Sequence, residues 1–324
     1  MPSPSVQLTT LRPDLASFLE YDLQSDAEGF IATKVFPVID VASQAGVFGT
    51  IPVEELLEQR VTRRSPGSGY ARGNFNFTTQ SYACVEHGAE EPVDDRQAKM
   101  YANYFDSEVI ATQRAFSSIL RNAEQRVADV VFNTTTFTGA AYTTAVGTAW
   151  SNVASSVPIT DVDAALKKVW DNSGMWPNAL VVNYKVFRNL RRNAQVIDRI
   201  QSAGAGDKAK QNDITAGMLA EAFGVEQVLV AGASRNNAKE GQTAAPTQIW
   251  SDSFAMVCRI ENSKDMAKPC IGRTFHWSED GSSIGGTVES YRDETVRGNI
   301  IRVRHDVAEV LLNRKMGHLL SNIT

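Results

Sequence analysis

The chain has 324 residues, of which 43% are hydrophobic and 21% are charged. This composition is ordinary for a globular protein and supplies a core for one large domain or for two to three smaller ones. The formal net charge of −5 argues against sequence-independent binding of nucleic acid, because such binding uses clustered Lys and Arg to neutralise phosphates. Neither a membrane-length apolar run nor a secretory signal pattern is present, so we expect a cytoplasmic protein without a membrane span.

The N-terminal region combines polar residues with short apolar segments. Residues 1–11 are small and polar, which is typical of a mobile arm, and a short helix is expected to begin near Arg12. Its apolar face would consist of Leu15, Phe18, Leu19 and Leu23. The run 35–41 is rich in β-branched and aromatic residues but contains Pro37, which indicates an edge strand or an extended arm.

Residues 51–92 predict a long β-hairpin. Two segments, 57–64 and 74–82, have extended patterns, and the turn-rich stretch 65–73 lies between them. Nothing beside this hairpin in the sequence supplies a third strand, and an isolated two-stranded hairpin is marginally stable in water. A second copy of the chain is the simplest partner that could stabilise the hairpin. The alternative is a solvated hairpin with scattered charges.

The charges of this region favour head-to-tail contact between copies. Arginines gather near the tip, and carboxylates follow on the returning segment, so the two ends carry opposite signs. The predicted inter-subunit contact residues are Arg60, Arg63, Arg64, Tyr70, Arg72, Phe75, Phe77, Glu86, Glu90 and Glu91.

The stretch 94–132 predicts one long amphipathic helix. No glycine or proline lies between Pro92 and Gly139, Asp94 is a suitable N-cap, and Asp95 places a carboxylate in the first turn. A coiled coil is the alternative, but the stripe contains small and polar residues and the opposite face has few charge pairs. The apolar stripe recurs at steps of three and four through Tyr101, Phe105, Val109, Thr112, Phe116, Ile119, Ala123, Val127 and Val130.

The rest of the chain predicts an α+β architecture. After a connector at 134–156, helices are expected at 161–170 with Thr160 as cap, 184–192, 194–201 and 214–223, the last ended by Gly224. Buried strands are expected at 179–183 and 225–231, a loop at 232–247, and further strands at 249–250 and 254–260. The end of the chain alternates as an antiparallel set at 287–292, 299–306 and 308–313, closing with 317–322.

The sequence offers no reaction centre. The four histidines stand far apart and outside metal-binding spacings, and no nucleophile elbow or phosphate loop is present. The odd number of cysteines, without C-x-x-C spacing, predicts buried or free thiols at Cys84, Cys258 and Cys270. We therefore expect no catalytic residue, no cofactor and no metal site.

The order of arm, projecting hairpin, long helix, α/β segment and returning strands resembles the major capsid proteins of tailed bacteriophages, which have the Hong Kong 97-like fold. The resemblance covers nearly the whole chain. It is carried by Phe30-Ile31-Ala32 with Val35-Phe36-Pro37-Val38, by 177–183 with 186–187 and 198–200, and by 219–225 with 228–232.

The resemblance implies five regions: an N-terminal arm at 1–44, an extended loop at 45–93, a peripheral domain at 94–159 that contains the spine helix, an axial domain at 160–270, and returning peripheral strands at 271–324. It implies a structural role in which hexamers and pentamers build an icosahedral shell around double-stranded DNA. The expected location is the virion capsid, assembled in the host cytoplasm.

The implied partners are further copies of the chain, scaffolding, portal and cement or decoration proteins, and packaged DNA held without sequence-specific contact. Some members of the family join subunits through an isopeptide bond from a lysine on the extended loop, but this chain has no lysine between Lys34 and Lys99. We therefore expect non-covalent assembly or a separate cement protein. The chain starts directly at the arm, which predicts that a fused scaffolding segment is absent or removed. The alternatives are an encapsulin-like nanocompartment shell and an α/β enzyme that uses residues 160–260.

Overall fold

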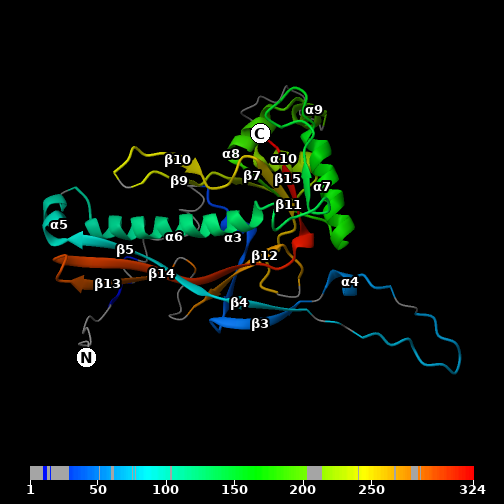
Figure 1. Cartoon of the computed structure of the whole chain (residues 1–324), viewed down its shortest axis with the longest axis horizontal. Coiled ribbons are helices and arrows are strands. Elements are labelled where there is room, and N and C mark those ends of the chain that lie inside the picture. The colour runs from blue at the N-terminus through cyan, green and yellow to red at the C-terminus, as the bar shows by residue number, and fades with distance from the viewer. Residues whose placement is uncertain are drawn as a thin grey trace.

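A long helix lies between two β-sheets. The computed structural model describes residues 10–12, 15, 29–50, 52–59, 62–74, 76, 78–102, 104–202, 214–239, 241–265, 268–278, 284 and 286–324. The first sheet runs along the helix α6 (Ser107–Val131), and the second sheet with its helices lies at the C-terminal end of α6 (Figure 1). Most of the predicted arm and of the helix expected near Arg12 falls outside the described residues.

The first sheet is built around one long strand, β14 (Gly298–Leu311). It pairs antiparallel with β13 (Thr287–Asp293), β12 (Gly272–Trp277) and β5 (Val85–Asp94). β1 (Thr10–Leu11) adds to β13, and β2 (Val38–Val41) lies parallel to β12 at the other edge. The edge strand expected after Val35 is confirmed, behind a short helix α3 (Ala32–Val35). The two separate strands expected at 299–306 and 308–313 were wrong, because β14 runs through both.

The second sheet has the order β6-β15-β11-β7-β8. Its strands are β6 (Thr143–Ala145), β15 (Gly317–Ser321), β11 (Phe254–Cys258), β7 (Ala179–Asn183) and β8 (Gln227–Ala231). The closing strand β15 thus pairs with β11 and β6 rather than with the set that contains β13 and β14. Local alternation cannot reveal this, because it does not specify which distant strand will be the partner.

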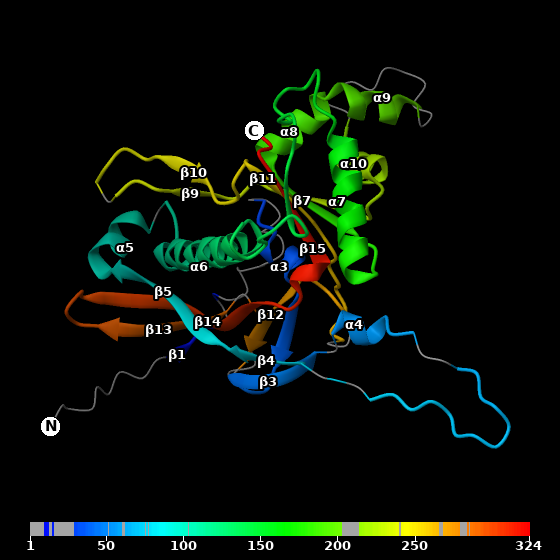
Figure 2. The ribbon, with the colours of Figure 1, turned by 45° about the vertical axis from the view of Figure 1, so that its right-hand side comes forward.

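Helices cover one face of the second sheet (Figure 2). They are α7 (Pro158–Ser173), α8 (Tyr184–Arg192), α9 (Ala194–Ser202) and α10 (Ala216–Phe223). The left-handed cap at Gly224 is confirmed by its φ of 70°. Thr160 is not the cap of α7, since the helix begins at Pro158, a residue that the first turn accepts because its missing N–H has no intrahelical partner there.

The strands of the second sheet contribute to two hydrophobic cores. Along β7, Ala179 and Val181 face the core that contains α6, whereas Leu180 and Val182 face the core beneath α7, α8 and α10. Successive side chains of a strand point to opposite faces, so a strand covered on both sides is apolar throughout. This explains why residues 179–182 form a continuous apolar run.

The predicted single helix over 94–132 is broken. α5 (Asp95–Tyr101) ends before α6 begins, and Asp106 caps α6 by accepting a hydrogen bond from the backbone N–H of Glu108. Asp94 is the N-cap of α5, as expected, and accepts from Arg96 N and Gln97 N. The apolar stripe packs on β5 and β14 along α6, but at the break Tyr101 and Phe105 are each 43% exposed.

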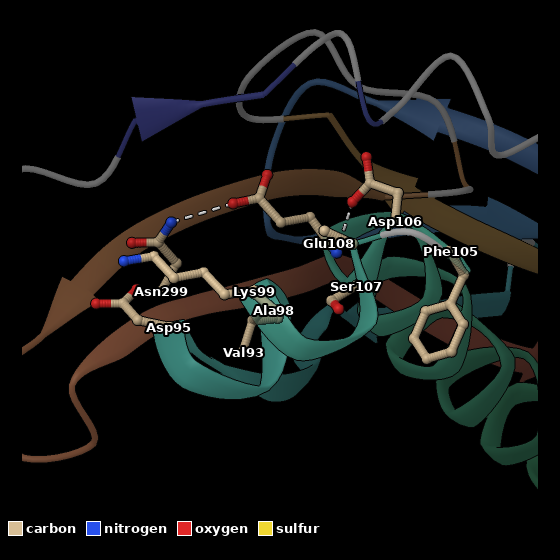
Figure 3. A pocket seen from close by; sticks show the side chains of 10 residues that line it. Val93, Asp95, Ala98, Lys99, Phe105, Asp106, Ser107, Glu108 and Asn299 are labelled. Atoms are coloured by element: carbon tan, nitrogen blue, oxygen red, sulfur yellow. Dashed lines mark hydrogen bonds between the residues drawn. The ribbon is translucent and has the colours of Figure 1, made fainter.

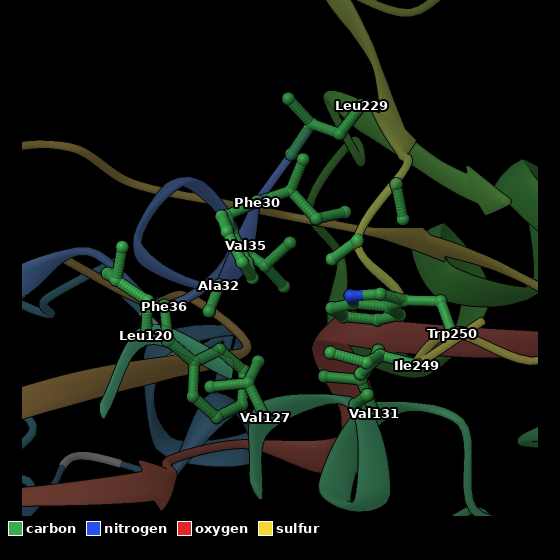
Figure 4. Close-up of a cluster of buried hydrophobic side chains, with 14 of the residues drawn as sticks. Phe30, Ala32, Val35, Phe36, Leu120, Val127, Val131, Leu229, Ile249 and Trp250 are labelled. Atoms are coloured by element: carbon green, nitrogen blue, oxygen red, sulfur yellow. The ribbon is translucent and has the colours of Figure 1, made fainter. Parts of the chain in front are cut away.

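Two further local expectations were wrong. The segment 232–247 contains a small hairpin of β9 (Ser234–Asn236) and β10 (Pro246–Gln248), whose strands pair antiparallel. Ile249 and Trp250 form no strand and instead lie buried against α6. In Figure 4, Trp250 lies near Ile249 and Val131, opposite the segment that carries Phe30 and Val35. All three cysteines are buried and free, as expected.

A buried carboxylate joins the arm segment, α6 and the segment that carries Trp250. Glu124 on α6 is 1% exposed, and its oxygens accept hydrogen bonds from Ile31 N at 2.9 Å, from Ala32 N at 2.8 Å and from the indole Nε1 of Trp250. Burial raises the pKa of Glu124, and the hydrogen bonds from these three donors act in the opposite direction. The charge is acceptable in the interior because three donors surround it.

We expect Glu124→Gln to lower the free energy of unfolding by about 2–4 kcal/mol, because the amide group would direct N–H bonds at backbone or indole donors and leave buried groups unpaired. Urea denaturation of the purified chain measures the loss. Asp129→Asn, at an exposed position of the same helix, is the matched control and should change the value little. An equally small effect of Glu124→Gln would contradict the role assigned to this carboxylate.

Two buried histidines are neutral in the folded chain. His318 contacts Ala141 O through Nδ1 at 3.1 Å and Thr144 Oγ1 through Nε2 at 2.9 Å, and the ammonium group of Lys168 donates to the same Thr144 oxygen at 2.6 Å. Burial lowers the pKa of His318 to about 4, and nearby Lys168 lowers it further. Burial also lowers the pKa of His305 to about 4.

Stability should therefore decrease as the pH falls from about 6.5 towards about 4. In this window the unfolded chain binds protons at both histidines and the folded chain does not, so each histidine costs about 3 kcal/mol by the lower end. Unfolding measured at several pH values tests this. The His318→Asn variant should show a shallower decrease than the parent chain, and an identical slope would contradict the assignment for His318.

Candidate assembly surface

A thin loop projects from the body of the molecule. Residues 52–59, 62–74 and 76 lie between the two strands of a small separate sheet, at 45–50 and 78–83, and Figures 1 and 2 show most of this segment extending away from the body of the molecule. All described residues from 62 to 74 are exposed. Within the single subunit, this stretch of the loop therefore leaves its side chains accessible to solvent.

The strands at the root of this loop differ from the prediction. β3 (Ala45–Thr50) pairs antiparallel with β4 (Thr78–Ala83), with Ala45 opposite Ala83 and Thr50 opposite Thr78. The strand expected at 57–64 was wrong, because α4 (Val53–Leu56) precedes it and the described residues 57–59 and 62–64 form no strand. Directly after β4, β5 continues into the first sheet, so the adjoining sequence does enter a larger sheet.

Aromatic packing and hydrogen bonds anchor the β3–β4 hairpin on the first sheet. The rings of Tyr82 and Phe275 are stacked with centroids 4.6 Å apart, and Phe48 packs against Phe275 at 5.3 Å. Gln80 donates through Nε2 to Leu312 O at 2.9 Å. On the other arm of the loop, Val53 of α4 is buried in the core that contains α6. Both arms of the loop therefore start from fixed points.

The tip of the loop is a locally ordered turn. Ser65-Pro66-Gly67-Ser68 closes through Ser68 N donating to Ser65 O at 3.1 Å, and Gly67 has a φ of 82°. Proline followed by a residue with positive φ is the pattern of a type II turn. Arg64 donates through Nε to Ser68 O at 2.6 Å, and its guanidinium lies 4.9 Å from the ring centroid of Tyr70.

The structure divides the predicted contact residues into two groups. Arg63, Arg64, Tyr70 and Arg72 are exposed on the projecting loop, which carries no carboxylate between residues 62 and 74. Glu86, Glu90 and Glu91 belong to β5, in the body of the molecule. The remaining members of the set, Arg60, Phe75 and Phe77, lie outside the described residues.

The β5 carboxylates already have partners within the subunit. Glu90 forms an ion pair with Arg302 at 2.6 Å, and Glu91 lies 3.6 Å from Arg114. Glu86 is exposed and lies opposite Asp306 in the register with β14. Two of the three carboxylates therefore contribute to the packing of β5 on β14 and α6, a use that charge counting along the sequence does not reveal.

A groove at the break between α5 and α6 was missed by the sequence analysis. It has a volume of about 490 Å³ and is lined by residues from β5, α5, the start of α6 and β14. Figure 3 shows Asn299 bonded to Glu108 on one wall, with Phe105 beside Asp106 and Ser107 at the start of α6. An adjoining hollow of about 230 Å³ shares Val93, Ala98, Phe105 and Ser107.

The groove combines exposed apolar groups with an excess of carboxylates. The rings of Tyr101 and Phe105 are stacked with centroids 5.3 Å apart, and the neighbouring Tyr104 is 82% exposed. Two cations, Lys99 and Arg114, line the groove and the adjoining hollow, and the carboxylates that line them are Glu91, Asp94, Asp95, Asp106 and Glu108.

Cations outside the lining neutralise part of this charge. Arg292 pairs with Asp95 at 2.6 Å, which lowers the pKa of Asp95, and Arg12 pairs with Glu108 at 3.0 Å. Asp94 and Asp106 instead accept hydrogen bonds from backbone N–H groups at the two helix starts. The sequence signal for this site was the N-cap pattern at Asp106-Ser107, which the continuing apolar stripe concealed.

Among the described residues, no cluster of three or more His, Cys, Asp or Glu side chains is arranged to hold a metal ion. No helix in the described part of the chain combines the length and the apolar character needed to span a membrane.

Comparison with known proteins identifies the class. No family model matches the chain. The major capsid protein of Burkholderia phage BcepMu is 24% identical over 306 residues, which cover 91% of each chain. A phage-related protein from Bordetella bronchiseptica RB50 has a similar structure, with a TM-score of 0.70 and 21% identity over 98% of each chain. The capsid structure of cyanophage P-SCSP1u matches with a TM-score of 0.58 and 12% identity, covering 89% of this chain and 86% of that one.

The chain therefore has the Hong Kong 97-like fold of phage capsid proteins. Its role is that of a structural capsid protein, and its sequence is related to the major capsid proteins of Burkholderia phage BcepMu and Pseudomonas phage JBD67.

Proposed function

We propose that the chain assembles as hexamers and pentamers into an icosahedral shell that encloses double-stranded DNA. The observation that carries this proposal is the projecting loop, whose described residues between 62 and 74 are all exposed although its two arms start from fixed points on the body. A loop that contributes so little to its own subunit gains contacts when a neighbouring copy receives it. The net charge of −5 suits a shell that holds DNA without binding it tightly.

The proposed division of the chain follows its order. The N-terminal arm takes residues 1–44, the extended loop 45–93, the peripheral domain 94–159 and 271–324, and the axial domain 160–270. The first sheet with α6 supports the peripheral domain, and the second sheet with α7 to α10 supports the axial domain. Within this scheme β6 and β15 pair with the axial strands, so the chain crosses between the domains at both segments.

The proposed contacts between copies join unlike surfaces. Arg63, Arg64, Tyr70 and Arg72 of one loop would meet carboxylates on the body of the next subunit, which is a heterologous contact of the kind that closes rings. Scaffolding, portal and cement or decoration proteins are the further proposed partners, with assembly in the host cytoplasm. Without a lysine between Lys34 and Lys99, the loop assembles non-covalently or with a cement protein. Catalysis has no part in this function.

Expression of the chain should give closed particles of megadalton mass. Negative-stain microscopy and size-exclusion chromatography with light scattering measure them, and boiling in denaturant should return monomers because no covalent link is expected. Nuclease-protected double-stranded DNA in particles from infected cells distinguishes a virion shell from a protein nanocompartment. A monomer that turns over substrates would contradict the proposal.

Removal of Pro66–Gly73 should leave folded subunits that do not close into shells, because the arms can no longer reach the next copy. The matched control replaces the same eight residues with glycine and serine, which keeps the length and removes the side chains. Thermal denaturation of both variants checks folding, and microscopy checks closure. Normal shells from the shortened chain would show that the loop is dispensable.

A further inference from the structure

Helix α8 carries four cations and no carboxylate over Tyr184–Arg192. Tyr184, Arg188 and Arg191 follow one another at steps of four and three, which places them on one face of the helix, and Arg192 and Lys185 border the same face. The opposite face is apolar and packs into the core beneath the helices of the second sheet. Its buried residues are Val186, Phe187 and Leu190.

Three of the four cations have no carboxylate partner in the described part of the chain. Lys185 is neutralised by Asp252, whose Oδ2 lies 2.6 Å from the lysine Nζ. Among the described residues, the side chains of Arg188, Arg191 and Arg192 form no ion pair and no hydrogen bond. The basic face of α8 is therefore not offset by a neighbouring acidic element.

Arg191 lacks an acceptor at a buried position. Its guanidinium lies 5.4 Å from the ring centroid of Phe187, which holds the side chain along the helix. The Nε atom of Arg191 is buried, and no described residue accepts a hydrogen bond from it. A buried donor without an acceptor costs free energy. An anion bound to the fork of this guanidinium would supply the acceptor.

The dimensions and chemistry of this face suit the backbone of double-stranded nucleic acid. The nine residues of α8 extend over about 13 Å at 1.5 Å per residue, and each DNA strand presents a phosphate about every 3.4 Å along the axis. Arginine forks bind phosphate oxygens through two parallel N–H···O bonds. The hydroxyl of Tyr184, a residue that is 50% exposed, is a further donor of the kind that contacts phosphates.

We propose that α8 is the surface through which the chain contacts the phosphate backbone of packaged double-stranded DNA. This inference rests on the proposed shell function and names the contact surface. Figure 2 shows α8 near α9 and the C-terminus, away from the first sheet and from the extended loop. Three arginines in each copy give a weak contact that reads no sequence, and the copies of a shell add up many such contacts.

The dependence of DNA binding on salt tests the proposal. Unassembled subunits of the full-length chain are separated from particles by size-exclusion chromatography and titrated into a short fluorescent DNA duplex, with anisotropy as the readout. Between about 50 and 200 mM NaCl, three phosphate contacts give a slope of about −2.7 for log K against log salt. Arg188→Gln with Arg192→Gln should reduce the slope by about 1.8 and weaken binding roughly tenfold or more at the lower salt.

The matched control removes two cations elsewhere. Arg235→Gln with Lys239→Gln changes two exposed residues of the segment 234–248 and should leave the slope at the parent value. Arg188→Lys with Arg192→Lys keeps the charge and should retain most of the slope. Thermal denaturation checks folding, and Arg192→Gln alone, with a reduction of about 0.9, replaces the double variant if that variant does not fold.

Four results would overturn the inference while the shell function stands. They are a parent chain that forms shells but does not bind the duplex at low salt, a glutamine variant with the parent slope, a control variant that loses as much binding, and closed shells that bind added duplex on their outside. Glutamine variants that bind DNA normally but no longer assemble would assign the face to a second copy instead. Assembly is measured separately by microscopy, so a parent chain that forms no shells contradicts the shell function itself.

Discussion

The structure depends on one buried carboxylate. Glu124 lies in the middle of the contact between the arm segment at Ile31–Ala32, helix α6 and Trp250, and each of the three supplies or receives a hydrogen bond there. A charge in an apolar interior is tolerated where donors surround it, so these parts must come together in one arrangement. The hydrophobic contacts around them are less specific, because apolar packing tolerates shifts that a hydrogen-bonded charge does not. Glu124 therefore fixes the position of the arm on α6 relative to the second sheet.

Packing on both faces of the second sheet joins the two sheets into one body. Met256 of β11 and Leu319 of β15 belong to the core that contains α6, whereas Val257 and Leu320, their neighbours along the chain, belong to the core under the helices. A rotation of the second sheet relative to α6 would disturb both cores at once. Because the body is rigid, the root of the extended loop, stacked through Tyr82 on Phe275, has a defined direction. The groove between α5 and α6, at the opposite end of the long axis in Figure 1, has a defined direction relative to it.

Local sequence patterns predicted the local elements, but they did not predict features that depend on residues far away in the sequence. The strand 179–183 and the helix 184–192 lie where the sequence placed them, because a continuous apolar run is a sufficient local signal; the cap at Asn183, which accepts from Lys185 N, appears only in the structure. The helix break was missed because Tyr101 and Phe105 continue the spacing of three and four across it. The pairing of β15 with β11, and of β3 with β4, depends on contacts across the chain that no local pattern encodes. For the candidate site, the exposed arginines of the loop were predictable from composition, but the intramolecular ion pair of Glu90 with Arg302 was not.

The same reasoning applies to the extended loop. Holding a residue in one conformation costs roughly 1–2 kcal/mol of backbone entropy. The contacts of the Ser65–Ser68 turn, together with those of Arg64 to Ser68 and Tyr70, shape the tip. All described residues between 62 and 74 are exposed, so within one subunit this stretch buries little surface that could offset the entropy. In the proposed assembly a neighbouring copy would supply that burial, and because the root of the loop is anchored on the body, the direction of the loop would set how one subunit follows the next.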